Sequence, residues 1–237
     1  VFAFIRAGVD CGSALLASTQ ASVYYDASPP ADVSVTVANA TAANATAGAP
    51  PYVRSNKVTL DVAANDSSGV AQMCVGFSAA PSGGKMTKCT WQPFASPAAV
   101  KLRTFQGNHT VRVALRDPFG HESAAETSVV LDSQSPRLSG LKVAPAPEPG
   151  ELRLTWASGD AGAGVAQHAL LYRAGTTYPA RGCAAADGDV AVPLPPGPDV
   201  KAASVAGLGA GATYTFRLCA TDGAGNLATG ITARVKL

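Results

Sequence analysis

Residues 110–120 read Thr-Val-Arg-Val-Ala-Leu-Arg-Asp-Pro-Phe-Gly, and residues 215–225 read Thr-Phe-Arg-Leu-Cys-Ala-Thr-Asp-Gly-Ala-Gly. Both stretches alternate apolar and polar residues and then reach Asp-x-x-Gly, the pattern of a strand that runs into a turn. Residues 2–12, Phe-Ala-Phe-Ile-Arg-Ala-Gly-Val-Asp-Cys-Gly, are a version with a shorter turn. The three aspartates are Asp10, Asp117 and Asp222, so the spacings are 107 and 105 residues. The chain therefore repeats a unit of ordinary domain size.

Two further markers recur in the same frame. The segments Asp26-Ala-Ser-Pro29 and Asp132-Ser-Gln-Ser-Pro136 begin 106 residues apart, and Gly-Val-Ala-Gln occurs at residues 69–72 and 164–167. We expect residues 1–28 to be the final two strands of a truncated preceding module, and residues 29–132 and 133–237 to be two whole modules.

The periodicity within each module is that of strands. Val58-Thr-Leu-Asp-Val and Leu152-Arg-Leu-Thr-Trp place an apolar residue at every second position, and helical spacing is almost absent. Short strands separated by Gly and Pro in a unit of this size predict an all-β fold of tandem antiparallel seven-stranded β-sandwiches.

These residues resemble two families of extracellular module. Residues 133–237 are similar to fibronectin type III modules. The similarity is carried by Trp156, by Tyr172, and by Val205-Ala-Gly-Leu208 followed by Thr213-Tyr-Thr-Phe216. That resemblance implies a Trp between the sheets and a corner tyrosine whose hydroxyl bonds the backbone of a turn. Gly209 to Ala212 depart from it, since they replace the usual proline after the Gly-Leu turn. Residues 29–132 resemble the Ig-like repeats of large bacterial-type surface proteins, which share the segment from Trp91 to Phe94.

Asparagines and cysteines indicate the compartment. Four of the six asparagines open an N-x-S/T sequence, which predicts N-glycans on loops and strand ends in a secretory protein: Asn39, Asn44, Asn65 and Asn108. Cys74 and Cys89 flank a Pro-Ser-Gly-Gly turn and suit a hairpin disulfide. Cys183 and Cys219 would then pair, which leaves Cys11 either bonded to an upstream partner or free and buried.

Composition and motifs argue against several functions. Charged residues are 14% of the chain, the net charge is +2, and cations form no run, so we expect neither nucleic-acid binding nor membrane contact by this segment. His109, His121 and His168 stand in no nucleophile, zincin or paired-carboxylate motif. We expect them to be surface or strand-end residues and the chain not to be an enzyme.

The recurrent aspartates are the candidate binding residues. In a sandwich of this topology the entry linker, the loop between the second and third strands and the last turn meet at one end. The frame therefore groups Asp26, Asp66 and Asp117 in one module, and Asp132, Asp160 and Asp222 in the next. Three carboxylates at a module junction are ligands that Ca²⁺ prefers. The alternative is that each aspartate accepts N–H bonds in its own turn, where Gly supplies a positive φ. A glycan on Asn65 would also crowd the first group.

The expected function is structural: a module array in a secreted or cell-surface glycoprotein, forming part of an extracellular filament or stalk. Its expected partners are neighbouring modules of the same chain and other copies or other surface proteins. The alanine-rich, sequon-rich composition resembles green-algal surface glycoproteins, among which mastigoneme subunits and gamete adhesion proteins carry Ig-like arrays. The alternatives are an adhesin or receptor ectodomain and, third, a carbohydrate-binding module of a secreted enzyme, for which Tyr24, Tyr25 and Tyr178 are the available aromatics.

Overall fold

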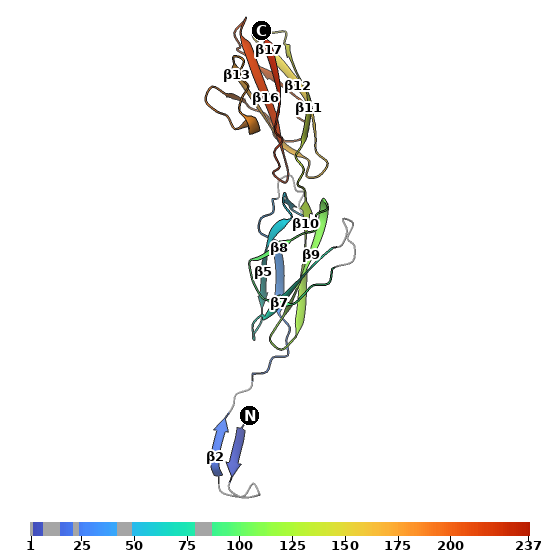
Figure 1. Cartoon of the computed structure of the whole chain (residues 1–237), viewed down its shortest axis with the longest axis vertical. Coiled ribbons are helices and arrows are strands. Elements are labelled where there is room, and N and C mark those ends of the chain that lie inside the picture. Colours follow the sequence, from blue (N-terminus) through green and yellow to red (C-terminus); the bar gives the residue numbers. More distant parts are fainter. Residues whose placement is uncertain (1, 7–14, 21–23, 42–48, 79–86) are drawn as a thin grey trace.

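The protein forms a hairpin followed by two β-sandwiches arranged end to end (Figure 1). The structure, a computed structural model, describes residues 2–6, 15–20, 24–41, 49–78 and 87–237. In the hairpin, β1 (Phe2–Arg6) pairs antiparallel with β2 (Leu15–Gln20). No helix in the described part of the chain is both long and apolar enough to cross a membrane.

The first sandwich contains one sheet of three strands and one of five. The three-stranded sheet has the order β3 (Ala31–Val37), β5 (Lys57–Asn65), β8 (Ala98–Lys101). The five-stranded sheet has the order β4 (Tyr52–Val53), β10 (Glu122–Leu131), β9 (Gly107–Arg116), β6 (Gln72–Phe77), β7 (Gln92–Pro93).

The first sandwich departs from the expected seven antiparallel strands, because the described residues form eight strands and one pair is parallel. The chain leaves β3 in one sheet and reaches β4 at the edge of the other, where Tyr52 and Val53 run parallel to Val130 and Leu131 of β10. This two-residue pairing covers one edge of β10, which would otherwise present unpaired backbone groups.

The core of the first sandwich follows the alternation in the sequence. Along β5, Val58, Leu60 and Val62 are buried, while Asp61 between them is exposed. Val, Leu and Met side chains from both sheets fill the space between them. Burying each such side chain stabilises the fold by roughly 1.5–3 kcal/mol.

The second sandwich has seven described strands, all paired antiparallel. One sheet has the order β11 (Arg137–Pro145), β12 (Leu152–Gly159), β15 (Ala202–Val205). The other has the order β14 (Val190–Val192), β13 (Val165–Ala174), β16 (Thr213–Asp222), β17 (Ile231–Lys236). A single 3₁₀ turn, η1 (Arg181–Cys183), lies in the connection from β13 to β14.

Aromatic residues fill the second core as the sequence predicted. Trp156 is buried on β12, and Phe216 of β16 is fully buried. The hydroxyl of buried Tyr214 accepts a hydrogen bond of 2.8 Å from the backbone N–H of Gly209. This bond ties the turn before β16 to the core, which is the role expected of the corner tyrosine.

Both expected disulfides are present in the structure. Cys74 of β6 is bonded to Cys89, 15 residues later, and Cys183 of η1 is bonded to Cys219 of β16, 36 residues later. Loops of this length correspond to roughly 3–4 kcal/mol of stabilisation through the unfolded state. Cys11 lies outside the described residues.

Candidate functional site

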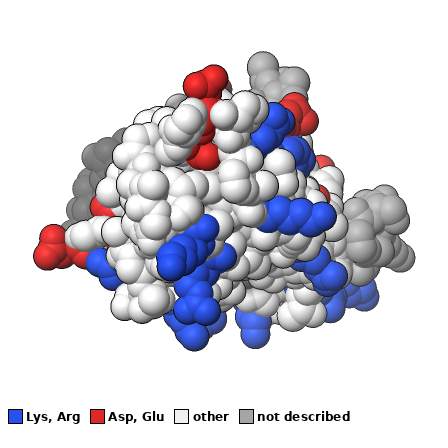
Figure 2. Space-filling view, turned by 90° about the horizontal axis from the view of Figure 1, so that it is seen from above, with Lys and Arg blue, Asp and Glu red and all other residues white. Residues whose placement is uncertain are grey.

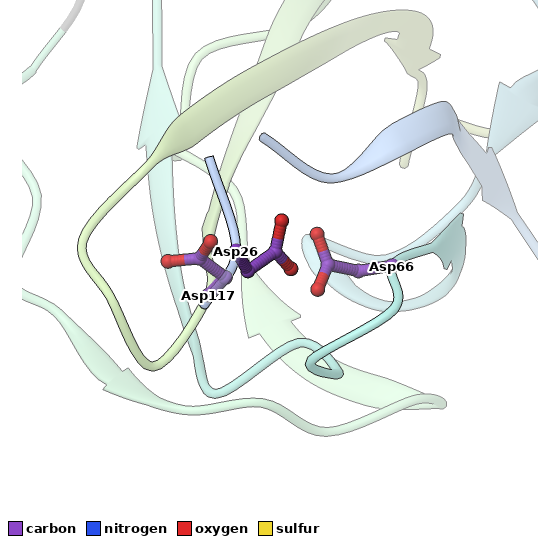
Figure 3. Close-up of side chains that lie close together, drawn as sticks. All are labelled: Asp26, Asp66 and Asp117. Atoms are coloured by element: carbon purple, nitrogen blue, oxygen red, sulfur yellow. The ribbon is translucent and has the colours of Figure 1, made fainter. Parts of the chain in front are cut away.

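Three aspartates converge at one end of each sandwich. In the first, Asp26 precedes β3, Asp66 lies between β5 and β6, and Asp117 begins the turn from β9 to β10 (Figure 3). Each of the three offers a carboxylate oxygen, and these oxygens lie within 4.8 Å of one another. We call this group the first triad.

The second sandwich repeats the arrangement at equivalent positions. Asp132 directly follows β10, Asp160 lies between β12 and β13, and Asp222 ends β16. Their nearest carboxylate oxygens are again within 4.8 Å of one another. We call this group the second triad. The structure thus brings together both sets of aspartates that the sequence frame had grouped.

The last member of each triad shapes its own turn. Asp117 Oδ1 accepts the N–H groups of Phe119 and His121, at 2.8 and 2.9 Å. Asp222 Oδ1 accepts the N–H of Asn226 at 2.7 Å. Each turn also contains a glycine with positive φ, 93° in the first and 87° in the second. The Asp-x-x-Gly pattern is therefore explained by turn geometry whether or not an ion binds.

The loop aspartates are held in the same way. Asp66 Oδ1 accepts the N–H and the hydroxyl of Ser68, at 2.8 and 2.7 Å. Asp160 Oδ2 accepts the N–H groups of Gly162 and Gly164, both at 2.9 Å. A carboxylate has about four lone-pair positions, so these bonds leave acceptor capacity on each side chain.

The linker aspartates differ, because they fasten the linker to the sandwich that follows. Asp26 Oδ2 accepts the hydroxyl of Ser67 at 2.9 Å. Asp132 Oδ2 accepts the N–H of Ala163 at 2.6 Å. The contact with Asp132 is so close that a Cβ at Gly162 would overlap the Asp132 carboxylate. A larger residue at position 162 would require that carboxylate or the loop to move.

Asp132 also belongs to the preceding sandwich. Its backbone N–H donates to the carbonyl of Val53 in the first sandwich, at 2.9 Å. Its backbone carbonyl accepts the side-chain amide of Asn226, at 2.8 Å. A second bond between the sandwiches joins the hydroxyl of Thr41 to the carbonyl of Gly223, at 2.9 Å. The two sandwiches therefore meet through hydrogen bonds at the second triad.

The triads concentrate negative charge in a partly enclosed space. Asp26, Asp117, Asp132 and Asp222 are buried, and the two loop aspartates are half-buried. Among the described residues, no Lys or Arg lies within 4.0 Å of any triad carboxylate. The cluster is therefore not neutralised by an ion pair with a strong base.

The pKa values respond to this environment in opposite directions. Burial raises the pKa of Asp160, and the charges of Asp132 and Asp222 raise it further against the hydrogen bonds that lower it. The N–H of Ser28 and the hydroxyl of Ser67 lower the pKa of Asp26.

Asp117 shows the balance most directly. Burial, the largest single effect, raises its pKa, but the hydrogen bonds from His121 and the turn backbone together outweigh it and leave the pKa lowered. His121 Nδ1 lies 2.7 Å from Asp117 Oδ2. In the second triad the equivalent position is Asn226, whose side-chain amide donates to Asp222 Oδ2 at 2.8 Å.

Sequence reasoning missed these supporting residues, although a signal for them exists. His121 and Asn226 each stand four residues after the turn aspartate, so they occupy the same position of the repeat. Gly162, Ser67 and Thr41 carry no such signal, because their role depends on contacts between separate loops.

The expectation that the histidines are surface or strand-end residues is wrong for His109 and His168, which are buried on β9 and β13. His109 is fully buried, with its ring stacked on Phe105 and Nε2 3.0 Å from the Phe105 carbonyl. His168 is buried beside Trp156, and its Nε2 lies 2.8 Å from Ser158 Oγ. Burial lowers the pKa of both rings.

The described glycosylation candidates lie on the surface. Asn39, Asn65 and Asn108 are exposed, whereas Asn44 lies outside the described residues. Asn65 Nδ2 donates to Asp32 Oδ2 at 3.0 Å, and the residue directly precedes Asp66. Tyr24 and Tyr25, two of the aromatics available to a carbohydrate-binding module, lie in the segment between β2 and β3 and are exposed.

Comparison with known proteins gives similarity of fold. No family model and no curated protein matches the chain. The fibronectin(III)-like modules of Clostridium thermocellum CbhA are 12% identical, with 86% of this chain and 94% of that chain covered and a TM-score of 0.45. The FN1–FN3 domains of chicken CNTN1 are 14% identical, with 89% and 68% covered and a TM-score of 0.44. A segment of two fibronectin type III domains from chicken tenascin is 13% identical, with 89% and 100% covered and a TM-score of 0.34.

The identities and TM-scores are low, so these neighbours assign neither a family nor a function to the chain. The strand orders show tandem β-sandwiches, and Tyr214 forms a tyrosine corner of the kind found in Ig-like sandwiches. The two triads are the feature that its two sandwiches share beyond the fold.

Proposed function

We propose that this chain is a non-catalytic spacer, part of an extracellular filament or stalk of a secreted or cell-surface glycoprotein, whose module junctions are stiffened by Ca²⁺. The observation that carries the proposal is that each triad joins a linker aspartate to two aspartates of the following sandwich. An ion held by all three carboxylates would therefore fix the linker to that sandwich.

The geometry of both triads suits Ca²⁺. Two oxygens bound to one Ca²⁺ at roughly 2.3–2.6 Å can be at most about 5 Å apart. The triad oxygens fall within that limit, at 4.8 Å or less. Ca²⁺ takes six to eight oxygen ligands, so backbone carbonyls and water would complete the shell. Its charge would relieve the repulsion from Asp132 and Asp222 that, together with burial, raises the pKa of Asp160.

A stiff junction also has contributions that need no metal. Pro136 fixes φ at the start of the second sandwich, and Asp132 is hydrogen-bonded to both sandwiches. The connection from β10 to β11 is only five residues long, residues 132–136. A linker this short and this well bonded favours a semi-rigid rod, the shape that a spacer needs.

Two disulfides and four glycosylation sequences support an oxidising, secretory setting. The alanine-rich composition supports a parent of the green-algal surface type, such as a mastigoneme subunit. N-glycans on the exposed asparagines would shield the sides of the rod and leave its ends free to stack.

Calcium titration tests the proposal. Saturating Ca²⁺ at 100 times Kd stabilises a one-site protein by about 2.7 kcal/mol, which raises the melting temperature by several degrees. We expect this shift in the unmodified chain. Asp160→Asn should reduce it, and Asp199→Asn, an exposed aspartate outside both triads, should not.

Small-angle X-ray scattering then tests stiffness. The distribution of particle lengths should narrow when Ca²⁺ is added. If saturating Ca²⁺ does not change the melting temperature, the chain does not bind Ca²⁺ at the triads and that part of the proposal is wrong. If scattering shows that the two sandwiches move freely relative to each other, the proposed spacer function is wrong.

One observation favours the second candidate, an adhesin or receptor ectodomain. Tyr24 and Phe119, 57% and 49% exposed, stack with ring centroids 6.1 Å apart beside the first triad, and Tyr25 is 84% exposed. Exposed aromatic residues in a group are characteristic of contact surfaces. Cross-linking from position 25 on native cells would distinguish a spacer from an adhesin. A spacer should be cross-linked only to other subunits of its own filament.

A further inference from the structure

One sheet face of the second sandwich carries a groove that the proposed spacer function does not use. The groove has a volume of about 440 Å³ and lies between η1, β16 and the start of β17. The residues that line it are Tyr178, Arg181, Arg217, Thr229, Gly230 and Thr232.

The outer face of β17 extends the positive charge of this groove. Ile231, Ala233 and Val235 are half-buried, and the alternate residues Thr232, Arg234 and Lys236 are exposed. Thr232 pairs with Arg217 of β16, so these exposed side chains share the face on which Arg217 lies. Figure 2 looks down on the C-terminal end, toward which β17 runs, and shows Lys and Arg side chains on part of that end with few Asp or Glu among them.

These cations are free to bind a ligand. In the described part of the chain, no carboxylate lies within 4.0 Å of Arg181, Arg217, Arg234 or Lys236. The nearby acidic side chain of Asp189 is already paired with Arg173, at 3.1 Å.

The groove is also rigid. The Cys183–Cys219 disulfide ties η1, and with it Arg181, to β16. Arg217 Nε donates to the carbonyl of Pro179 at 2.7 Å, which orients the guanidinium. At Gly230 an added Cβ would lie 2.8 Å from Cys219 Sγ, so the floor requires glycine there. A preorganised site loses less entropy when it binds a ligand.

We propose that this groove binds an acidic polysaccharide, through its sulfate or carboxylate groups. Guanidinium groups pair with such anions in bidentate, charge-assisted hydrogen bonds. Arg234 and Lys236 are two residues apart on a strand, about 7 Å, so the same face presents charges in a row for a polymer.

The neutral residues distinguish a sugar chain from an acidic peptide. Exposed Tyr178 offers an aromatic face to a sugar ring, and the hydroxyls of exposed Thr229 and Thr232 offer hydrogen bonds to sugar hydroxyls. The groove thus combines the contacts that an anionic carbohydrate needs, and a spacer that binds one would be attached to the surrounding matrix along its side.

The test is binding of heparin, a sulfated polysaccharide, and of polygalacturonate, a carboxylated one, to the full chain. The variant R181E/R234E reverses one exposed charge in the groove and one on the adjoining outer face of β17. The matched control R137E/R153E makes the same charge change at exposed positions of β11 and β12, in the other sheet. Measurements in EDTA keep the result independent of any calcium site.

We expect R181E/R234E to lower heparin affinity by about tenfold or more, since two charge-assisted contacts are lost, and the control to change it by less than about threefold. Tyr178→Ala should weaken polysaccharide binding and leave the weak binding of inorganic sulfate unchanged. The melting temperature of each variant and of the neutral R181Q/R234Q shows that the sandwich is intact.

Three results would overturn the proposal. The first is no binding of either polysaccharide by the unmodified chain. The second is an equal loss in R137E/R153E, which would mean a non-specific effect of net charge. The third is poly-glutamate binding as tightly as the polysaccharides with the same dependence on Arg181 and Arg234, which would assign the groove to an acidic peptide.

Discussion

Gly162→Ala is the substitution whose effect the structure defines most sharply. The added methyl group would overlap Oδ2 and Cγ of Asp132 and lie only 2.8 Å from its Oδ1. Either the Asp132 side chain or the loop must move, and the 2.6 Å bond from the N–H of Ala163 is then lost. Because both atoms of that bond are buried, the loss leaves them unsatisfied. We expect the second sandwich to lose about 1–3 kcal/mol.

Gly159→Ala is the matched control. An added Cβ there meets nothing within 4 Å, and Gly159 is exposed at the end of β12. The control should be neutral, or stabilising by less than about 1 kcal/mol, since alanine restricts the unfolded chain.

The assay is urea unfolding of the full chain combined with hydrogen exchange of peptides from β16, which assigns the change to the second sandwich. A double-mutant cycle with Asp132→Ala completes the test. Gly162→Ala should cost little when the carboxylate is absent, because the two substitutions remove the same contact. Equal stability of Gly162→Ala and Gly159→Ala, or full additivity with Asp132→Ala, would refute the reasoning.

Three other predictions follow from single contacts. Tyr214→Phe removes the hydrogen bond to Gly209 and should lower the free energy of unfolding, measured in urea, by about 1 kcal/mol. The far-UV circular dichroism spectrum of the folded chain should not change. Because burial lowers the pKa of His109 and His168 in the folded chain, the unfolded chain binds protons more readily. Stability should therefore begin to fall as the pH decreases toward the unfolded pKa of about 6.5, and it should keep falling to about pH 5.5. A melting temperature that rises as the pH is lowered through this interval would contradict the prediction. Asn226→Ala removes the amide that joins the linker carbonyl to the turn carboxylate, and scattering should show a looser junction while hydrogen exchange of the β-sheet cores stays unchanged.

The triads could be predicted because the repeat supplied their register. The linker aspartates recur 106 residues apart and the turn aspartates 105 apart, and the loop aspartates, 94 residues apart, precede the same Gly-Val-Ala-Gln sequence. Sandwich topology brings the linker, this loop and the last turn to the same end. Only local pattern and known topology were needed. Whether an ion binds could not be read in the same way, since the aspartates also satisfy their own turns.

The buried histidines could also have been predicted. His109 shares its alternation with Val111, Val113 and Leu115, all buried on β9, so its parity already placed it in the core. The polar character of the side chain outweighed the pattern in our expectation.

The basic groove lay beyond sequence reasoning. Arg181 and Arg234 are 53 residues apart and belong to no motif. They share a face because the Cys183–Cys219 disulfide folds η1 onto β16 and because β17 pairs beside it. A charge patch formed by neighbouring strands and a disulfide-bonded loop can be recognised only when the strand register is known.

The position of Asp132 bears on how an array of this kind can grow by gene duplication. Its side chain is held by a loop of the sandwich that follows it, and Asp26 is held in the same way by the loop between β5 and β6 of the first sandwich. A duplicated segment that began at the first strand of a sandwich would omit the linker aspartate. The new copy would then have only two of the three triad carboxylates. The heritable unit is therefore a sandwich together with the linker before it.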